Sequence, residues 1–155
     1  MKIIQTVILT LEERQSLFEL WNEEYPERIG YKDLRGFENY LQALSSLEHY
    51  LLVNNLNQIF GWGFTFVREE DIWFGIIIDS KMQGKGFGTL LLDELKKNTV
   101  ILNGWAADHQ NEVKRNKEIY LSPLGFYTTN GFLIDQNVRM ENDSISAVKI
   151  RWGSK

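Results

Sequence analysis

Residues 72–97 have the sequence IWFGIIIDSKMQGKGFGTLLLDELKK, in which three patterns follow one another. The apolar run 72–78 is typical of a buried strand. Glycine then occupies every second position over 84–88. From Phe87 to Leu95, apolar residues recur every four positions, as they do on one face of a helix. The segment therefore predicts a strand, a glycine loop and a helix.

A junction of this kind is suited to bind a phosphate group. The first N–H groups of a helix lack partners within the helix, and glycines let a ligand come close to them. The loop does not match the P-loop pattern, because Gly86 follows Lys85 where Ser or Thr is needed. It does not match the dinucleotide pattern, because Thr89 stands where a third glycine is needed. Residues 83–88 (QGKGFG) instead show Gln, two residues, Gly, one residue and Gly.

A second motif stands near the C-terminus, where residues 125–132 read GFYTTNGF. The loop and this motif resemble the acetyl-CoA loop and the F-Y-x-x-x-G-F segment of the GNAT superfamily of N-acetyltransferases. The predicted order of elements is also similar to that family's: strand, loop, helix, strand, helix, Gly-Phe, strand. The resemblance covers roughly residues 50–135.

The whole chain predicts a GNAT-like mixed α+β fold, with helices on both faces of a sheet of about six to seven strands. Thr10 and Glu13 form a capping-box pattern at the start of a first helix, which Pro26 ends. The other expected elements are strands over 2–9, 49–53, 58–68, 72–78, 100–107, 132–141 and 145–152, a second helix over about 37–47 and a short one over 125–130. The connections within 49–78 are too short for crossovers, so these three strands are predicted to form an antiparallel meander.

The strand over 100–107 is expected to lie parallel to the one over 72–78, because a helix connects them. The resemblance implies that these two strands splay apart and that CoA lies in the gap. Asn103-Gly104 is unusual inside a strand and has two interpretations. A bulge or kink would suit the splay, whereas a turn would make the segment a simple hairpin.

Composition limits the class of protein. The chain has 155 residues, of which 43% are hydrophobic, and this predicts one domain over residues 1–155. It has no cysteine, so neither a disulfide nor a thiolate site is present. A net charge of −4 without a basic tract argues against binding to nucleic acid. No apolar run approaches a membrane span and no signal-peptide pattern is seen, so we expect a cytoplasmic protein without membrane contact.

The resemblance implies that acetyl-CoA is the co-substrate, and it assigns residues to this ligand. The pyrophosphate would be held by backbone N–H groups of the loop and by flanking side chains, from Gln83, Gly84, Lys85, Gly86, Gly88 and Thr89. The end of the central strand, from Ile76 to Ile78, would pair its backbone with the pantetheine arm. One of its N–H groups would then face the thioester oxygen, which becomes anionic during transfer.

Acyl transfer from a thioester to an amine needs a proton donor for the leaving thiolate. Tyr127 matches the family's tyrosine, and a phenol with a pKa of about 10 is protonated at neutral pH. Tyr127 is therefore the predicted donor to the CoA sulfur. Family members often have Asn seven residues earlier, where this chain has Tyr120. Asn111, Asn116 or Ser122 would have to replace that contact with CoA, or it is absent.

The sequence leaves the general base open. Candidates are the acidic or imidazole side chains of Glu23, Glu24, Asp71, Asp108 and His109. Water could also relay the proton of the amine to solvent. No metal-ligand spacing is present, so no metal is expected.

The resemblance implies that the segment between the first strand and the meander shapes the acceptor pocket. This segment holds aromatic and acidic residues, and we expect Trp21, Glu24, Tyr25 and Tyr31 to bind the acceptor. Rings and carboxylates would suit a cationic amine, by charge and by cation–π attraction. An amphipathic helix with a solvated acidic face would give the same pattern. Small amines, amino acids, aminoglycoside-like compounds and protein amines all stay open as acceptors.

These features predict an N-acetyltransferase that transfers the acetyl group of acetyl-CoA to a primary amine. Direct attack in a ternary complex is favoured, because the chain has no cysteine to carry an acyl group. The alternatives are a non-catalytic acyl-CoA-binding or regulatory module and a nucleotide-binding α/β domain with a chance loop. A homodimer is a further prediction, since tryptophans such as Trp62, Trp73, Trp105 and Trp152 would form a dimer face if they were exposed.

Overall fold

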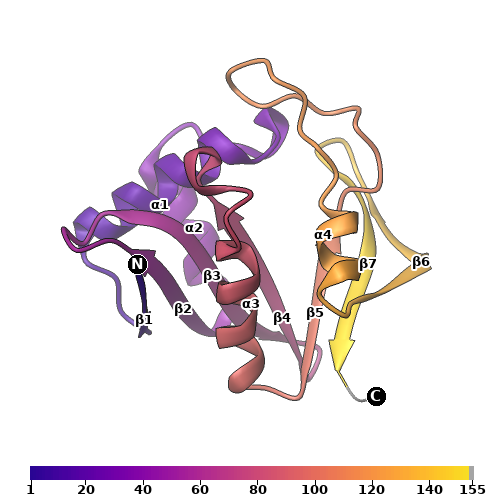
Figure 1. Ribbon diagram of the computed structural model, residues 1–155. Helices are drawn as coiled ribbons and strands as arrows, with labels where there is room; N and C mark the ends of the chain where they lie inside the picture. Colours follow the sequence, from indigo (N-terminus) through magenta and orange to yellow (C-terminus); the bar gives the residue numbers. More distant parts are fainter. Residues whose placement is uncertain (154–155) are drawn as a thin grey trace.

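The computed structural model describes residues 1–153. They form a seven-stranded mixed sheet with strand order β1-β2-β3-β4-β5-β7-β6 (Figure 1). The strands are β1 (Lys2–Thr6), β2 (Ser45–Val53), β3 (Ile59–Arg68), β4 (Asp71–Ile78), β5 (Ile101–Ala106), β6 (Leu133–Glu141) and β7 (Ser146–Gly153). The helices are α1 (Leu11–Glu24), α2 (Leu34–Gln42), α3 (Phe87–Lys97) and α4 (Leu124–Thr129), with short 3-10 turns η1 (Glu27–Ile29) and η2 (Ser80–Met82).

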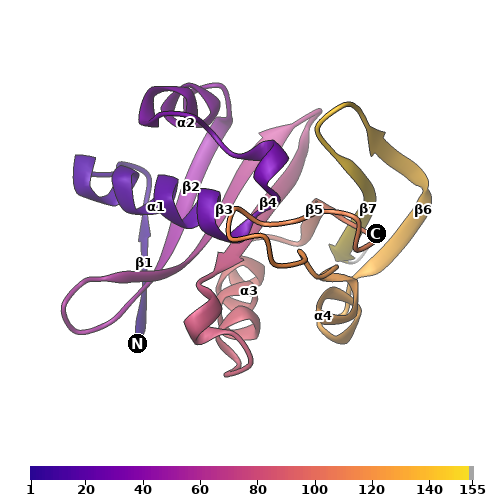
Figure 2. The ribbon, with the colours of Figure 1, turned by 90° about the horizontal axis from the view of Figure 1, so that it is seen from above.

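Helices cover both faces of the sheet, as the sequence predicts. Figure 2 shows α1 and α2 on one face and α3 and α4 on the other. Each face has its own buried cluster, one centred on Trp62 and Phe37 and the other on Leu91 and Leu95. The predicted mixed α+β fold and the meander of β2, β3 and β4 are confirmed. Strands β6 and β7 form an antiparallel pair at the C-terminal end of the chain.

Strand β4 lies at the centre of the sheet and supplies both clusters. Trp73 and Ile77 belong to the cluster under α1, whereas Phe74 and Ile76 belong to the one under α3. This alternation follows from the two-residue period of a strand. Gly75 lies between Trp73 and Ile77 on the same face of β4 and leaves room for the ring of Phe64. The Phe64 Cζ would lie 2.5 Å from a Cβ added at this position.

The parallel strands β4 and β5 separate along most of their length. Their only paired residues are Trp73 and Asn103, and Figure 1 shows the two strands diverging from that end. Beside this pair, the Asn103 amide donates a hydrogen bond of 3.0 Å to the carbonyl oxygen of Ile72. The predicted splayed pair is therefore present.

Both interpretations of Asn103-Gly104 are wrong. Strand β5 pairs with β7 in unbroken register from Ile101 to Ala106, so it contains neither a turn nor a bulge. Packing explains the glycine at position 104 instead, because a Cβ added there would lie 2.7 Å from the Phe74 ring. The splay comes from the lack of further pairing with β4 and not from a kink in β5.

Two predicted boundaries near the N-terminus are also wrong. Strand β1 ends at Thr6, not at residue 9, because the Thr6 hydroxyl bonds the backbone of Ile8 and turns the chain. Helix α2 spans Leu34–Gln42 and not residues 37–47, because Asp33 caps its start and β2 already begins at Ser45. The apolar spacing that suggested a longer helix continues past the real end of α2.

Helix α1 begins and ends as predicted. The Thr10 hydroxyl accepts from the Glu13 amide at 3.1 Å, and the Glu13 carboxylate accepts from the Thr10 amide at 2.8 Å. The helix ends at Glu24, two residues before Pro26. The cap and the proline together fix where the C-terminal end of α1 meets the splayed strands.

Residues 107–123 connect β5 to α4 without a helix or a strand of three or more residues. In Figure 1 this loop arches over the open end of the splayed strands toward η1. The amide of Glu27 donates to the Val113 carbonyl at 2.9 Å, and Pro26 forms an isolated bridge with Lys114. The loop is thus tied to the end of α1. No helix within residues 1–153 is long and apolar enough to cross a membrane.

Candidate active site

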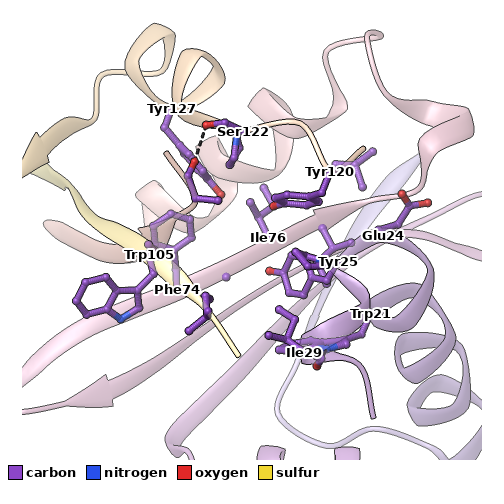
Figure 3. A pocket seen from close by; sticks show the side chains of 18 of the residues that line it. Trp21, Glu24, Tyr25, Ile29, Phe74, Ile76, Trp105, Tyr120, Ser122 and Tyr127 are labelled. Carbon is purple, nitrogen blue, oxygen red and sulfur yellow. Dashed lines mark hydrogen bonds between the residues drawn. The ribbon is translucent and has the colours of Figure 1, made fainter. Parts of the chain in front are cut away.

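A cavity of about 760 Å³ lies where β4 and β5 diverge. Its walls come from the end of α1, the glycine loop, β3 to β5, loop 107–123 and α4 (Figure 3). This volume falls in the range that small-molecule sites occupy. All the residues predicted for acetyl-CoA, acceptor and proton donor line it, with the exception of Lys85.

The glycine loop forms one wall of the cavity. Gly84 and Gly86 have φ values of +76° and +85°, which favour glycine, and Gly86 is the N-cap of α3. No atom lies within 4 Å of a Cβ added at either position, so the space beside the loop is open. The Lys85 side chain is exposed and does not line the cavity, so only its backbone remains a candidate contact.

Gly88 and Gln83 stabilise the loop in two further ways. A Cβ at Gly88 would lie 2.9 Å from the Phe126 ring, so this glycine lets α3 pack closely against α4. The Gln83 side-chain amide donates to the Ile78 carbonyl at 2.9 Å, which holds the loop against the end of β4. Thr89 also lines the cavity.

The end of β4 presents a backbone edge to the cavity. Ile76, Ile77 and Ile78 line the cavity and pair with β3 on one side only. On the other side, β4 has no pair beyond Trp73. Backbone groups without a partner in the sheet are available to a ligand. This edge is where the predicted pairing with pantetheine would take place, and that pairing stays a prediction.

Tyr127 reaches from α4 toward the cavity (Figure 3). Only 6% of this residue is exposed, and its ring lies among Phe74, Phe126 and Phe132, with centroids 5.2 to 5.8 Å away. Burial raises the pKa of its hydroxyl well above the ordinary value. The phenol is therefore protonated at any physiological pH.

Tyr120 also lines the cavity, although no role is predicted for it from the sequence. It occupies the position where the resemblance expected Asn, and burial raises its pKa to about 12. Burial is the main cause of the raised pKa of Tyr25 and of Tyr127, and the nearby Tyr120 hydroxyl adds to the rise in both, which indicates that the three hydroxyls lie close together. Periodicity could not identify Tyr120, because it belongs to an irregular loop.

The three residues considered as alternative CoA contacts, Asn111, Asn116 and Ser122, differ in whether they line the cavity. Neither Asn111 nor Asn116 lines the cavity. Asn116 instead accepts from the Glu118 amide at 3.0 Å. Ser122 does line the cavity, and its hydroxyl donates to the carbonyl of Ala107.

Glu24 lines the cavity, but its carboxylate is fully engaged. It accepts hydrogen bonds from the Ser80 amide at 2.9 Å, from the Ser80 hydroxyl at 2.6 Å and from Lys114 Nζ at 3.1 Å. Only 8% of the residue is exposed. Glu24 thus joins α1, η2 and loop 107–123, and its charge is balanced by Lys114.

The other candidate bases lie outside the cavity lining. Asp108 pairs with Arg139 at 2.7 Å, which lowers the pKa of this carboxyl. The His109 ring contacts the Ser146 carbonyl and accepts from the Asn111 amide. Glu112, the one other acidic residue of the lining, is hydrogen-bonded to Arg28, which lowers its pKa. Every carboxylate in the lining therefore already has a cationic partner.

Aromatic rings make up the wall opposite the glycine loop. We define the aromatic chamber as the part of the cavity lined by Trp21, Tyr25, Tyr31, Tyr40, Phe66, Trp73 and Trp105. Trp21 is fixed by a hydrogen bond of 2.9 Å from its indole to the Ile29 carbonyl. Trp73 and Trp105 stack with centroids 5.4 Å apart. The sequence identified Trp21, Tyr25 and Tyr31 of this set, and the others come from β3, β4, β5 and α2.

The tryptophans suggested for a dimer face are mostly interior. Trp62 is completely buried and Trp73 is 8% exposed, so they belong to the core under α1. An exposed tryptophan cluster is therefore the wrong basis for a dimer, and the homodimer itself stays a prediction. Among residues 1–153, no three His, Cys, Asp or Glu side chains are grouped as metal ligands would be.

Comparison with solved structures gives the same architecture at low sequence identity. An aminoglycoside 6'-N-acetyltransferase in complex with coenzyme A superposes with a TM-score of 0.74 at 12% identity, covering 97% of this chain and 96% of that one. A phosphinothricin acetyltransferase from Sinorhizobium meliloti in complex with AcCoA gives 0.67 at 10% identity, covering 99% and 90%. A chimera of the spermidine N-acetyltransferase SpeG from Vibrio cholerae and hSSAT gives 0.68 at 14% identity, covering 98% and 95%.

Sequence comparison identifies the family directly. No curated protein sequence matches the chain significantly. The model of the acetyltransferase (GNAT) family, however, matches residues 14–126, which include most of α1, the meander, the glycine loop, α3, β5 and the start of α4. The chain therefore belongs to the acetyltransferase (GNAT) family.

Proposed function

We propose that this protein transfers the acetyl group of acetyl-CoA to a primary amine by direct attack in a ternary complex, with residues 1–155 acting as one domain. The observation that carries the proposal is that one cavity joins the glycine loop, the unpaired edge of β4, Tyr127 and the aromatic chamber. Each of the groups that the chemistry needs therefore faces the same space.

The glycine loop and the end of β4 bind and orient the thioester in this proposal. The backbone N–H groups over 84–88, at the positive end of α3, hold the pyrophosphate. The unpaired edge from Ile76 to Ile78 hydrogen-bonds the pantetheine arm and leaves one N–H for the thioester oxygen. Open space beside Gly84 and Gly86 supports this fit, since a side chain there would occupy the place of the ligand.

Tyr127 supplies the proton that the thiolate needs. The amine nitrogen forms a bond to the carbonyl carbon, the carbon–sulfur bond breaks, and the Tyr127 hydroxyl donates its proton to the sulfur. Because burial raises the pKa of Tyr127, the hydroxyl gives up its proton only as the thiolate forms. The attacking nitrogen loses one proton to water, because each carboxylate of the lining is paired with a cation, and the tyrosinate then takes up a proton through water, which restores the phenol.

The test compares Tyr127→Phe with the unchanged protein. The proposal predicts that the acetylation rate falls strongly while the Kd for acetyl-CoA stays the same. If the acetylation rate were unchanged, Tyr127 would have only a packing role. A protein that binds acetyl-CoA but acetylates none of a panel of amines would favour the alternative of a non-catalytic acyl-CoA-binding module.

A further inference from the structure

One positive charge of the aromatic chamber has no ion-pair partner. Arg68, at the end of β3, lines the cavity, and its Cζ lies 5.0 Å from the centre of the Phe66 ring and 5.8 Å from that of Trp73. Burial raises the pKa of Tyr40 to about 12, and the charge of Arg68 partly offsets this rise, so Arg68 lies near Tyr40 of the chamber although it is exposed at the strand end. Among residues 1–153, no carboxylate lies within 4.0 Å of this guanidinium.

A second cation stands at the same ring. Lys149 belongs to β7 opposite Trp105, and its Nζ lies 5.5 Å from the centre of the Trp73 ring. It too forms no ion pair within the described residues. The acidic residues opposite these cations in the strand register, Asp71 for Arg68 and Asp135 for Lys149, form no ion pair with them within the described residues. Arg68 in the lining, with Lys149 just outside it, can therefore accept an anionic group of a ligand as its partner.

The chamber also holds hydrogen-bond donors that are not used. The indole N–H groups of Trp73 and Trp105 are both buried without a hydrogen-bond partner. Buried donors almost always have a partner in a folded protein, so an unpaired one requires an explanation. An acceptor oxygen brought by a ligand would satisfy this requirement.

These charges do not favour a cationic acceptor, which is one of the classes that the sequence leaves open. Glu24 and Glu112, the only acidic residues in the described lining, are balanced by Lys114 and Arg28. A polycation would find aromatic rings but no unbalanced carboxylate, and it would meet the charge of Arg68. A neutral amine meets no such repulsion, and neutrality is the state in which an amine attacks a thioester.

We infer that the acceptor joins three chemical parts: a neutral primary amine, a planar apolar body that fills the aromatic chamber, and an acidic group that binds Arg68 with support from Lys149. An aromatic amino acid has this combination. The inference rests on the proposed acetyl transfer for the role of the amine, whereas the anion site is a binding property of the chamber alone. Arg68 is then a specificity-determining residue.

The test uses two probes that lack an amine and differ only in charge, 3-phenylpropanoate and 3-phenylpropanamide. Calorimetric titration at low ionic strength should show the carboxylate binding at least tenfold more tightly than the amide. Arg68→Gln should reduce this ratio to below threefold, and Lys149→Gln should reduce it less. Arg35→Gln is the matched control, because Arg35 is exposed on α2 and lies outside the cavity lining.

Acetyl transfer gives the second readout. With acetyl-CoA, phenylalanine should have a higher kcat/KM than phenethylamine, and spermidine should have the lowest. Arg68→Gln should remove the preference for phenylalanine and leave the Kd for acetyl-CoA unchanged.

The two readouts separate the anion site from the proposed function. Equal binding of carboxylate and amide, or spermidine as the best acceptor, would overturn the anion site even if acetyl-CoA binds. Tight binding of the carboxylate probe without any binding of acetyl-CoA would instead support the anion site and contradict the proposed acetyl transfer.

Discussion

The two halves of the cavity are built in different ways. The cofactor half, made of the glycine loop and the end of β4, offers mainly backbone groups from one continuous segment, residues 76–89. The acceptor half, which is the aromatic chamber, is made of side chains from α1, α2, β3, β4, β5 and the connection after η1.

The difference separates recognition that many sequences can share from recognition that is specific to this protein. A backbone loop needs only glycine at a few positions, so many sequences can form it around the same phosphate ligand. A chamber of side chains changes whenever one of its residues changes. We therefore expect the cofactor half to define the family and the acceptor half to define the substrate of this protein.

We expect the largest effect from a substitution in the glycine loop. Gly86→Glu places a negative side chain in open space beside the expected pyrophosphate, at a φ of +85° that disfavours any side chain. Affinity for acetyl-CoA should fall at least about a hundredfold, because like charges meet at the helix N-terminus. Calorimetry measures this change.

Gly86→Ala separates charge from backbone strain. It introduces the same strain, about 1 kcal/mol in stability, with no charge and little bulk. Affinity for acetyl-CoA should then fall only slightly. If Gly86→Glu bound acetyl-CoA with unchanged affinity, the glycine loop would not be part of the binding site.

The next largest effect concerns Tyr127, the proposed proton donor. Tyr127→Phe keeps the ring among Phe74 and Phe132 and deletes only the hydroxyl, so the fold should be retained. The acetylation rate should fall about a hundredfold, within the range for loss of a general acid. Single-turnover kinetics with acetyl-CoA measure it.

Tyr120→Phe is the matched variant, since Tyr120 lines the same cavity. We expect a decrease of about tenfold or less, because this hydroxyl supports the site without donating to sulfur. A larger loss in Tyr120→Phe than in Tyr127→Phe would exchange the two roles.

The acceptor half also depends on a buried histidine. His49 is 2% exposed and accepts a hydrogen bond of 3.1 Å from the indole of Trp62, which packs against Trp21 of the chamber. Burial lowers the pKa of His49 from 6.5 to about 4. The unfolded chain therefore binds a proton between these pH values when the folded one does not.

Stability from His49 should be fully present above pH 6.5 and decrease progressively as the pH falls to about 4. The loss should be on the order of 2 to 3 kcal/mol. Urea denaturation over this pH range measures it. His49→Gln is less stable at neutral pH, and this part of its pH dependence should be missing. An equal slope in both proteins would assign the effect to other groups.

The smallest predicted effect tests how loop 107–123 is held over the cavity. Lys114→Gln removes the cation from Glu24, while Ser80 continues to donate to this carboxylate. Unfolding should become easier by about 1 to 2 kcal/mol, since a partly satisfied buried charge remains.

Lys117→Gln provides the comparison, because its pair with Glu27 is exposed. We expect less than about 0.5 kcal/mol there. Thermal denaturation of both variants measures the difference, and equal costs would show that burial of the Glu24 pair has no special effect.

The sequence predicts the cofactor half better than the acceptor half for a physical reason. Glycines at 84, 86 and 88, a strand before them and a helix after them are local features, and the loop over 83–89 lines the cavity apart from Lys85 and Phe87. Trp73 and Trp105 meet only because β4 and β5 pair at one point, which no local pattern records. Arg68 looked like the last residue of a strand, and its position in the chamber depends on the whole sheet.

The charges of the site were the least predictable feature. Glu24 is acidic in the sequence, yet Lys114, ninety residues away, neutralises it in the fold. The pairing depends on the path of loop 107–123, which has no periodic pattern. The same limit explains why the boundary of α2 was wrong, since the spacing of Leu41, Leu44 and Leu47 fits a helix although β2 begins at Ser45.

Calorimetric titration of the protein with acetyl-CoA, with ATP and NAD as controls, tests most directly whether the glycine loop binds this ligand. We expect micromolar binding of acetyl-CoA, weakened in Gly86→Glu, and no comparable binding of ATP or NAD. Absence of acetyl-CoA binding, or a preference for ATP or NAD, would contradict this expectation.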